Sequence, residues 1–268
     1  MGKDSATGKG KRENIASAIW NTGVAIPLVV LIFWHQGSKF GWWSAYLLPG
    51  PAVVMRSFFS LLESGELSRN IVSSIVRILK GFSVSSVFAL AAAFVCGIYR
   101  PMLRQLSPTL EFLRHIPPMA TIPMLILWFG IGEASKLVII VMATFFPIFL
   151  NTVQGVSQCD RGLLEVARIF GYTKAQSLRL VVLPSSLPYV LTGMRLGLGY
   201  SWRSLIAAEL VAASSGLGYM ILDAEQLSRP DVIMVGILVI GFLGSVMDFS
   251  LSYATARFTS YGRNDVVV

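Results

Sequence analysis

The segment from Glu165 to Pro184, EVARIFGYTKAQSLRLVVLP, is a polar stretch inside an otherwise strongly apolar part of the chain. It carries several charged side chains, a single glycine at Gly171 and a closing Leu-Pro pair. Apolar runs long enough to cross a bilayer lie on both sides of it. A polar, glycine-broken insert between two such runs indicates a loop outside the membrane with a helical structure of its own.

The composition places most of the remaining chain in a membrane. Of the 268 residues, 54% are hydrophobic and only 13% are charged, whereas soluble domains average about 25% charged residues. The formal net charge of +8 is spread over short segments between apolar runs, which is typical of orientation signals rather than of nucleic-acid binding. We therefore predict an all-α integral membrane protein, because long uniform apolar runs form helices and not barrel strands.

About six transmembrane helices are predicted, within a membrane domain at residues 15–257. Two short tails, residues 1–14 and 258–268, are predicted to lie in the cytoplasm. No small-residue cleavage pattern follows the first apolar run, so that run is expected to be an uncleaved span. The second helix is expected to begin near Ser68, before its apolar part. The spans are predicted at Ile15–Trp34, Gly81–Ile98, Leu103–Phe129, Ala134–Val156, Tyr189–Ala213 and Val232–Ala256.

The distribution of Lys and Arg predicts the orientation. With the N-terminus inside, the cytoplasmic segments hold more Lys and Arg than the outer segments, as the positive-inside rule requires. Both termini and the insert, taken as residues 158–184, then face the cytoplasm. The outer segment from Gln36 to Arg69 is expected to carry interfacial tryptophans and a short helix, Ala52–Leu62, on the membrane surface.

Capping and breaking residues divide the insert into two short helices. Asp160 is placed to cap the first, since its carboxylate can accept free backbone N–H groups. Gly171 is expected to end that helix in a left-handed turn. Thr173 and Gln176 form a T-x-x-Q capping box for the second helix, which Pro184 is expected to stop. The two helices are thus predicted to meet at an angle.

The first of these helices has one predicted apolar edge. Leu163, Ala167 and Phe170 recur at i, i+4 and i+7, which places them on one side of a helix. Such an edge either rests on the membrane surface or binds another protein, and the spacing leaves both interpretations open.

The chain lacks the residue patterns of a catalytic or metal site. The nearest approach to a P-loop, Gly8-Lys9-Gly10, lacks the first glycine at the required distance and the hydroxyl residue after the lysine. The two histidines, His35 and His115, have no carboxylates at the spacing of a metal cluster. Cys96 and Cys159 supply no disulfide framework or metal-ligand spacing and are expected to be buried or cytosolic thiols.

Charged residues inside spans are costly and need a physical reason. Arg114 and His115 lie near the middle of the third predicted span, directly before Pro117, where a missing backbone donor is expected to kink the helix. Arg203 and Glu209 lie in the fifth predicted span. Two interpretations stay open: either the arginines line an anion pathway with Glu209 as partner or gate, or Glu209 forms a structural ion pair with one of them. The small residues near Arg203, which let helices approach closely, are Gly197, Gly199 and Ser201.

The insert resembles the cytoplasmic loop of bacterial ATP-binding-cassette (ABC) import permeases. That loop reads E-A-A, three residues, G, nine residues, I, one residue, L-P, and this chain departs from it by Val166 and Val181. The resemblance implies that the first loop helix sits in a groove on a separate ATPase and transmits its closure to the spans. The residues that it implies for ATPase coupling are Glu165, Ala167, Arg168, Phe170, Gly171, Leu183 and Pro184.

Longer stretches resemble the branch of this family that imports aliphatic sulfonates, taurine and nitrate. They are LEFLRHIPPMATIPMLILWFGIGEASK (110–136), FFPIFLNTVQGV (145–156) and AAELVAASSGLGYMI (207–221). The resemblance implies the type I importer permease fold and a homodimer in the bacterial inner membrane whose pathway carries a small anion. An aliphatic sulfonate is the first expectation, with taurine, nitrate, bicarbonate or a vitamin precursor as alternatives.

The same resemblance implies the partners. They are two copies of an ABC ATPase, a second copy of this chain, a periplasmic substrate-binding protein and the lipid bilayer. ATP and Mg belong to the ATPase, so this chain is expected to bind no cofactor or metal and to be no enzyme. The Gly216–Gly218 turn and the Asp223–Asp231 segment are the expected contact surface for the binding protein.

Two other classes stay open on the residues alone. A self-contained secondary transporter predicts inverted repeats and acidic residues at the midplane, and no convincing internal repeat is present. A membrane enzyme predicts His, Asp or Glu gathered at one interface, whereas the 14 acidic residues are scattered along the chain.

Overall fold

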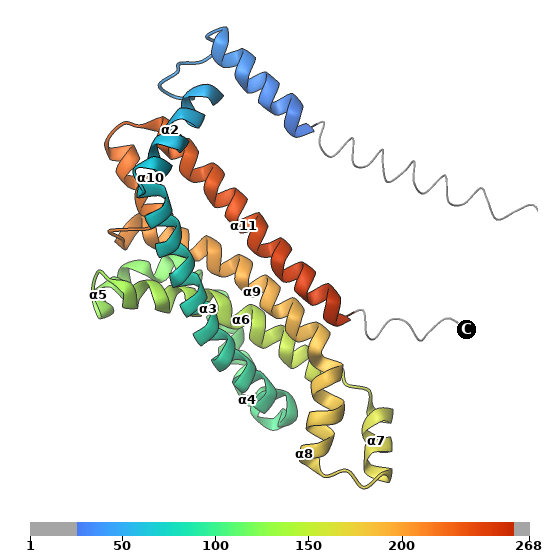
Figure 1. Cartoon of the computed structure of the whole chain (residues 1–268). Coiled ribbons are helices and arrows are strands. Elements are labelled where there is room, and N and C mark those ends of the chain that lie inside the picture. The colour runs from blue at the N-terminus through green and yellow to red at the C-terminus, as the bar shows by residue number, and fades with distance from the viewer. Residues whose placement is uncertain (1–25, 260–268) are drawn as a thin grey trace, which may run out of the picture.

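The computed structural model describes residues 26–259, and over that range the chain is a bundle of helices without strands (Figure 1). The predicted all-α membrane architecture is thereby confirmed. The bundle begins with a helix at residues 26–39. The elements that follow are α2 (Pro51–Glu63), α3 (Glu66–Ile98), α4 (Arg100–Arg114), η1 (Pro118–Thr121), α5 (Ile122–Phe129), α6 (Glu133–Ser157), α7 (Arg161–Ile169), α8 (Lys174–Ser177), η2 (Leu178–Val182), α9 (Leu183–Ala212), α10 (Leu217–Gln226) and α11 (Pro230–Thr259).

The centre of the bundle is α6, which packs against both α3 and α9. Small residues allow these close crossings. A methyl group added at Gly97 of α3 would lie 2.7 Å from Val156 of α6, and one at Gly197 of α9 would lie 3.0 Å from Ile148. The expectation that Gly197 brings two helices together is therefore confirmed. At α7 and α8 the chain projects from one end of this core, whereas α2 and α10 lie at the opposite end (Figure 1).

Three of the described helices, α3, α6 and α11, are each long and apolar enough to cross a bilayer. The predicted early start of the second helix is confirmed, since α3 begins at Glu66. At 30 residues, α9 is about 45 Å long at the usual helical rise and runs beside α6, although its composition does not meet the same criterion. The fourth, fifth and sixth predicted spans thus each coincide with one long helix.

The third predicted span, Leu103–Phe129, is wrong as a single helix. Helix α4 ends at Arg114, and the chain bends by 78° before it continues in η1 and α5. Pro117 and Pro118 lack backbone N–H groups, so the helical hydrogen bonds cannot continue across this point. In addition, α4 buries none of its residues. The expected kink is therefore a complete break.

The segment before α3 largely follows the sequence analysis. The predicted short helix at residues 52–62 is confirmed as α2, which starts at Pro51. The indole N–H of Trp34 donates to the Pro49 carbonyl at 3.1 Å and ties the first helix to the turn before α2. Residues 15–25 of the first predicted span lie outside the described range, as do residues 1–14 and 260–268 of the predicted tails.

Candidate functional site

The loop helix α7 is held by caps at both ends, as predicted. The Asp160 carboxylate accepts a hydrogen bond from the Gly162 backbone N–H at 2.8 Å. At the other end Gly171 has a φ of +74°, and the Tyr172 N–H donates to the Ala167 carbonyl at 2.9 Å, which closes a left-handed helix terminus. Because glycine adopts this φ without strain, Gly171 sets the direction in which the chain leaves α7.

The second loop helix does not stop where it was predicted to stop. The Thr173–Gln176 capping box is present at the start of α8. However, α8 continues through the wide turn η2 directly into α9, and Pro184 is the second residue of α9 rather than a terminator. Proline at this position removes one backbone donor, and a wide turn of the π type accommodates the loss. The loop is therefore a short helix, a bend at Gly171 and a continuation into a long helix.

Most apolar side chains of α7 point away from the rest of the chain. Ile169 is 83% exposed and Phe170 is 75% exposed, while Leu163 and Val166 are about half exposed. The predicted apolar edge of α7 included Ala167, and that part of the prediction is wrong. Ala167 is buried on the side of α7 that packs against α8 and η2. Its small side chain lets α7 lie close to that segment. We refer to Leu163, Val166, Ile169 and Phe170 as the loop patch.

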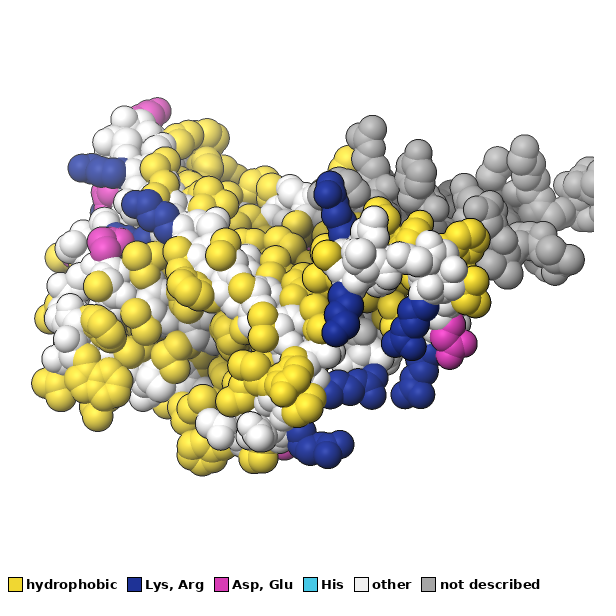
Figure 2. Space-filling model, turned by 90° about the horizontal axis from the view of Figure 1, so that it is seen from below, with side chains coloured by type: hydrophobic (Ala, Val, Ile, Leu, Met, Phe, Trp, Pro, Cys, Tyr) yellow, Lys and Arg dark blue, Asp and Glu magenta, His cyan; other side chains and the backbone are white. Residues whose placement is uncertain are grey.

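Charged residues surround the loop patch. Figure 2 looks onto this end of the molecule, where Lys and Arg side chains gather on the side at which α7 and α8 lie. Glu165 and Arg168 are exposed on α7, and Leu183 and Pro184 are exposed at the start of α9. The combination is an apolar surface with a mainly basic rim that no part of the described chain covers.

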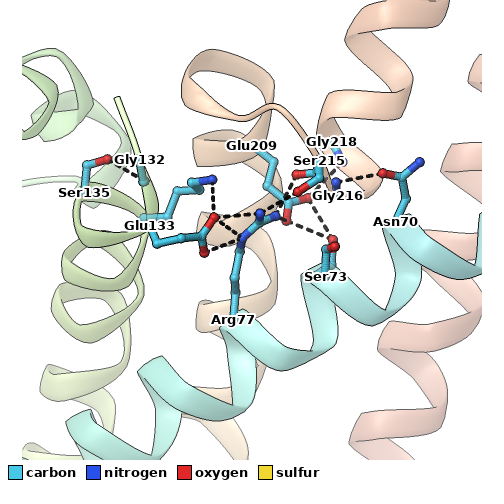
Figure 3. Close-up of polar contacts among 12 residues, drawn as sticks. Asn70, Ser73, Arg77, Gly132, Glu133, Ser135, Glu209, Ser215, Gly216 and Gly218 are labelled. Atoms are coloured by element: carbon cyan, nitrogen blue, oxygen red, sulfur yellow. Dashed lines mark hydrogen bonds and ion pairs between the residues drawn. The ribbon is translucent and has the colours of Figure 1, made fainter. Parts of the chain in front are cut away.

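A second group of polar side chains lies near the opposite end, where Glu209 of α9 is completely buried (Figure 3). The Ser74 hydroxyl lies 2.9 Å from both carboxylate oxygens. The Gly218 backbone N–H donates to the carboxylate at 3.0 Å, and the Arg77 guanidinium donates at 2.8 Å. The buried ion pair that was one of the two interpretations therefore exists, but its cation is Arg77 and not Arg114 or Arg203.

Arg77 joins this carboxylate to a second one. Its Nε and Nη2 atoms donate to Glu133 of α6 at 2.8 Å, and it also donates to the carbonyl and hydroxyl of Ser215. The Lys136 ammonium donates to Glu133 at 2.8 Å. Two cations and two carboxylates make the cluster electrically neutral, and together they connect α3, α6 and α9.

The turn before α10 is folded around Glu209. Gly216 has a φ of +117°, and a methyl group there would lie 2.3 Å from the Glu209 carboxylate. Gly216 and Gly218 are buried, so the expectation that this turn contacts a binding protein is wrong. The turn faces inward because its backbone N–H groups donate to Glu209, Ser74 and Asn70. Residues 225–229, within the Asp223–Asp231 segment, are exposed, and their role stays a prediction.

The structure separates the remaining predicted residues. Arg114 and His115 are exposed at the end of α4, next to the Pro117 break, and the His115 ring contacts the carbonyl of Glu111. Arg203 is exposed on α9, with its guanidinium 5.7 Å from the centre of the Tyr200 ring. Within residues 26–259 no ion pair joins Arg114, Arg203 or Glu209 to one another.

The polar face of α3 was not predicted. Neither Arg77 nor Lys136 was among the charged residues predicted to lie inside the protein, although both are buried. A usable signal was present, because Asn70, Ser74 and Arg77 recur at i, i+4 and i+7 and therefore share one side of a helix. Polar residues repeated in this way just before an apolar run indicate a helix face that meets polar partners inside the protein.

These features define the class of protein: a multi-pass helical membrane protein with a satisfied, charge-neutral interior at one end and an uncovered helical loop at the other. Residues 85–260 match the family described as the binding-protein-dependent transport system inner membrane component. The chain belongs to this family and is the permease subunit of an ABC importer, a multi-pass inner-membrane protein whose relatives are permeases rather than enzymes.

Relatives with related transport roles cover most of the chain. The putative aliphatic sulfonates transport permease protein SsuC of Bacillus subtilis is 37% identical over 229 residues, which cover 85% of this chain and 83% of the relative. The SsuC protein of Escherichia coli is 37% identical, with 84% and 86% covered. The taurine transport system permease protein TauC of Escherichia coli is 32% identical, with 87% and 86% covered. The predicted branch of the family is therefore confirmed.

A solved structure shows the same fold. A crystal structure of an amino acid ABC transporter with histidines superposes with a TM-score of 0.59 over 75% of this chain and 96% of that chain. The sequence identity is 16%, so this similarity bears on the fold alone. It confirms the predicted importer permease fold.

Proposed function

We propose that this permease subunit forms a homodimer that imports a small organic anion, an aliphatic sulfonate, at the expense of ATP hydrolysed by a separate ATPase. The relatives named for aliphatic sulfonates are 37% identical, whereas those named for taurine and bicarbonate are 32% and 31% identical. This difference in sequence identity favours a sulfonate as the substrate. Taurine and bicarbonate are the first alternatives to test in transport assays.

The loop patch is the observation that carries the proposal. Apolar side chains exposed on a loop outside the membrane are unfavourable in water, and such a patch marks contact with another protein or with the membrane surface. Phe170 and Ile169 supply the apolar contact, while the exposed Glu165 and Arg168 supply charged contacts beside it. In the proposed complex these residues bind an ABC ATPase, one copy for each permease.

The connection between the loop and the bundle supplies the mechanism. Because α8 passes through η2 into α9 without a loop, a displacement of α7 is transmitted to a helix about 45 Å long. Gly171 holds α7 at its angle, Ala167 keeps it against α8 and η2, and Leu183 and Pro184 begin the transmitting helix. Closure of two ATPases around ATP and Mg would draw two such loops together and open the dimer toward the periplasm.

This mechanism requires the loop and both termini to face the cytoplasm, and it requires a periplasmic binding protein at the other end. The basic rim around the loop patch agrees with that orientation. The exposed residues 225–229 are available for the binding protein. We place the anion pathway beside Arg203, and beside Arg114, His115 and Pro117 at the helix break, while Glu209 holds the turn before α10.

Co-purification of the ATPase tests the proposal. Phe170→Asp in the full-length chain should reduce recovery of the ATPase at least about tenfold, because it places a charge in an apolar contact. Phe59 of α2 is also an exposed phenylalanine, at the opposite end of the bundle, so Phe59→Asp is the matched control and should leave recovery unchanged. Equal recovery with both variants would refute the role of the loop patch.

A further inference from the structure

Helix α9 has two distinct faces. One face packs on α6 through Gly193 and Gly197, whose added methyl groups would lie about 3 Å from α6 atoms. The other face is exposed over about three helical turns. It consists of residues spaced at i, i+3, i+4, i+7, i+8 and i+11, namely Thr192, Arg195, Leu196, Gly199, Tyr200 and Arg203. We call this exposed row the α9 stripe.

Two adjoining cavities lie along the α9 stripe, between α9 and α11. One has a volume of about 470 Å³ and includes Leu191, Leu196 and Tyr200 in its wall. The other has a volume of about 830 Å³ and includes Trp202. Both are lined by the same three charged residues, Arg195, Arg203 and Asp248.

The charges in this wall do not cancel. Arg195 donates to both oxygens of Asp248, at 2.8 and 2.7 Å, so these two groups neutralise each other. Arg203 forms no ion pair within residues 26–259, where its guanidinium lies over the ring of Tyr200. One positive charge, with its hydrogen-bond donors free, therefore remains in the wall of both cavities.

The depth of Arg203 along α9 makes an unpaired charge there costly unless protein or water surrounds it. It lies nine residues before the end of α9 at Ala212, or roughly 14 Å along the helix, in a bilayer whose apolar core is about 30 Å thick. An unpaired arginine at such a depth is unfavourable against lipid and normally faces protein or a water-filled cavity. Leu196, two helical turns before Arg203 in the wall of the smaller cavity, suits an alkyl group.

We infer that the α9–α11 cavity is a binding site for a small organic monoanion, with Arg203 holding the acid group and the wall around Leu196 holding the alkyl part. A guanidinium donates two parallel hydrogen bonds to a planar or tetrahedral acid group. A single unpaired positive charge suits one negative charge and disfavours a dianion. The inference rests on the proposed import of an organic anion and assigns the residues that contact it.

Gly199 provides a direct way to close this site. A side-chain carbon added at Gly199 would meet no atom within 4 Å, because this glycine faces the cavity and not another helix. The earlier expectation that Gly199 helps helices to approach is therefore wrong for this residue. A leucine at this position should fill the cavity beside Arg203 without disturbing the packing of α9 on α6.

The experiment is protection of arginines from phenylglyoxal in the full-length chain in lipid nanodiscs, read residue by residue by mass spectrometry. Ethanesulfonate is the probe, and sodium chloride at equal ionic strength is the reference. We expect ethanesulfonate to slow modification of Arg203 about tenfold, as for a guanidinium held in charge-assisted hydrogen bonds. Modification of Arg56, exposed on α2 and outside both cavities, should not change.

In Gly199→Leu the protection of Arg203 should disappear, and in Gly199→Ala it should weaken, while the oligomeric state of both variants stays that of the wild type. Undiminished protection in Gly199→Leu would overturn the inference. Failure of Arg203 to react in the wild type would also overturn it, since lipid or a second copy would then cover the stripe. Because the protection assay contains no ATPase, its result does not depend on transport. If ethanesulfonate still protects Arg203 but ATP-driven uptake, measured separately, is absent, the import proposal is refuted and the binding site still stands.

Discussion

The two ends of the molecule use polar and apolar side chains in opposite ways. Near α10, a buried carboxylate and a buried arginine satisfy one another and the backbone of a turn, as Glu209 and Arg77 show. At α7, the loop patch leaves Phe170 and its neighbours exposed. The first region is satisfied within one chain, whereas the second exposes an apolar surface that the ATPase covers in the proposed complex.

The two ends also differ in the surroundings of a glycine that bends the chain. Gly216 and Gly171 both have positive φ values, +117° and +74°. A methyl group at Gly216 would collide with the Glu209 carboxylate, whereas one at Gly171 would meet no atom within 4 Å. The bend at Gly216 is thus shaped by its own surroundings. The bend at Gly171 has no such neighbour, which is expected if it orients α7 for a partner.

The largest effect is expected for Glu209→Ala. It leaves the Arg77 guanidinium and the Gly218 N–H without their buried acceptor, which should cost about 3–5 kcal/mol of folding free energy. The measurement is the thermal midpoint and the yield of folded protein in detergent. The double variant Arg77→Met with Glu209→Met should recover part of the loss, and a midpoint unchanged by Glu209→Ala would contradict the internal role of the cluster.

A smaller effect on stability, with a specific loss of binding, is expected for Gly171→Val. A β-branched residue in the left-handed region is strained by roughly 1–2 kcal/mol, and α7 should change its angle to relieve that strain. Recovery of the ATPase should fall at least about fivefold while the thermal midpoint of the bundle stays close to that of the wild type. Gly171→Asn, which tolerates this φ, should retain most of the recovery; the same loss in both variants would argue against an effect through the bend.

Thr173→Ala should have a local effect. The substitution removes the capping box of α8, and the loss of such a cap costs about 1 kcal/mol. Amide hydrogen exchange should increase in residues 174–178 and stay unchanged in α3 and α6. Thr173→Ser keeps the hydroxyl and is the matched control. Exchange that rises equally with both variants would show that the cap does not hold α8.

The smallest effect on stability is expected for Phe170→Ser. A largely exposed side chain that touches little of its own chain should change the folding free energy by less than about 0.5 kcal/mol. Glu209→Ala should lose much more folding free energy in the same thermal denaturation. The two variants together compare how much each end of the molecule contributes to stability. A large loss of stability in Phe170→Ser would mean that the loop patch packs within the chain.

Local rules predicted the loop more accurately than the interior. Asp160, Gly171 and the Thr173–Gln176 box act within a few residues of themselves, so sequence spacing was sufficient to find them. The partner of Glu209 lies 132 residues away in the chain, and only packing of α3, α6 and α9 brings it there. The continuation of α8 into α9 was missed for another reason, since a wide turn accommodates Pro184 where a regular helix would stop.

ATP-driven uptake of ethanesulfonate into proteoliposomes tests the account most directly. The vesicles contain the permease, its ATPase and its binding protein, and uptake is compared between wild type and Phe170→Ser. The account predicts ATP-dependent accumulation by the wild type and a loss of at least about tenfold in Phe170→Ser, with the variant still folded. Accumulation without ATP, or equal accumulation by both proteins, would contradict it.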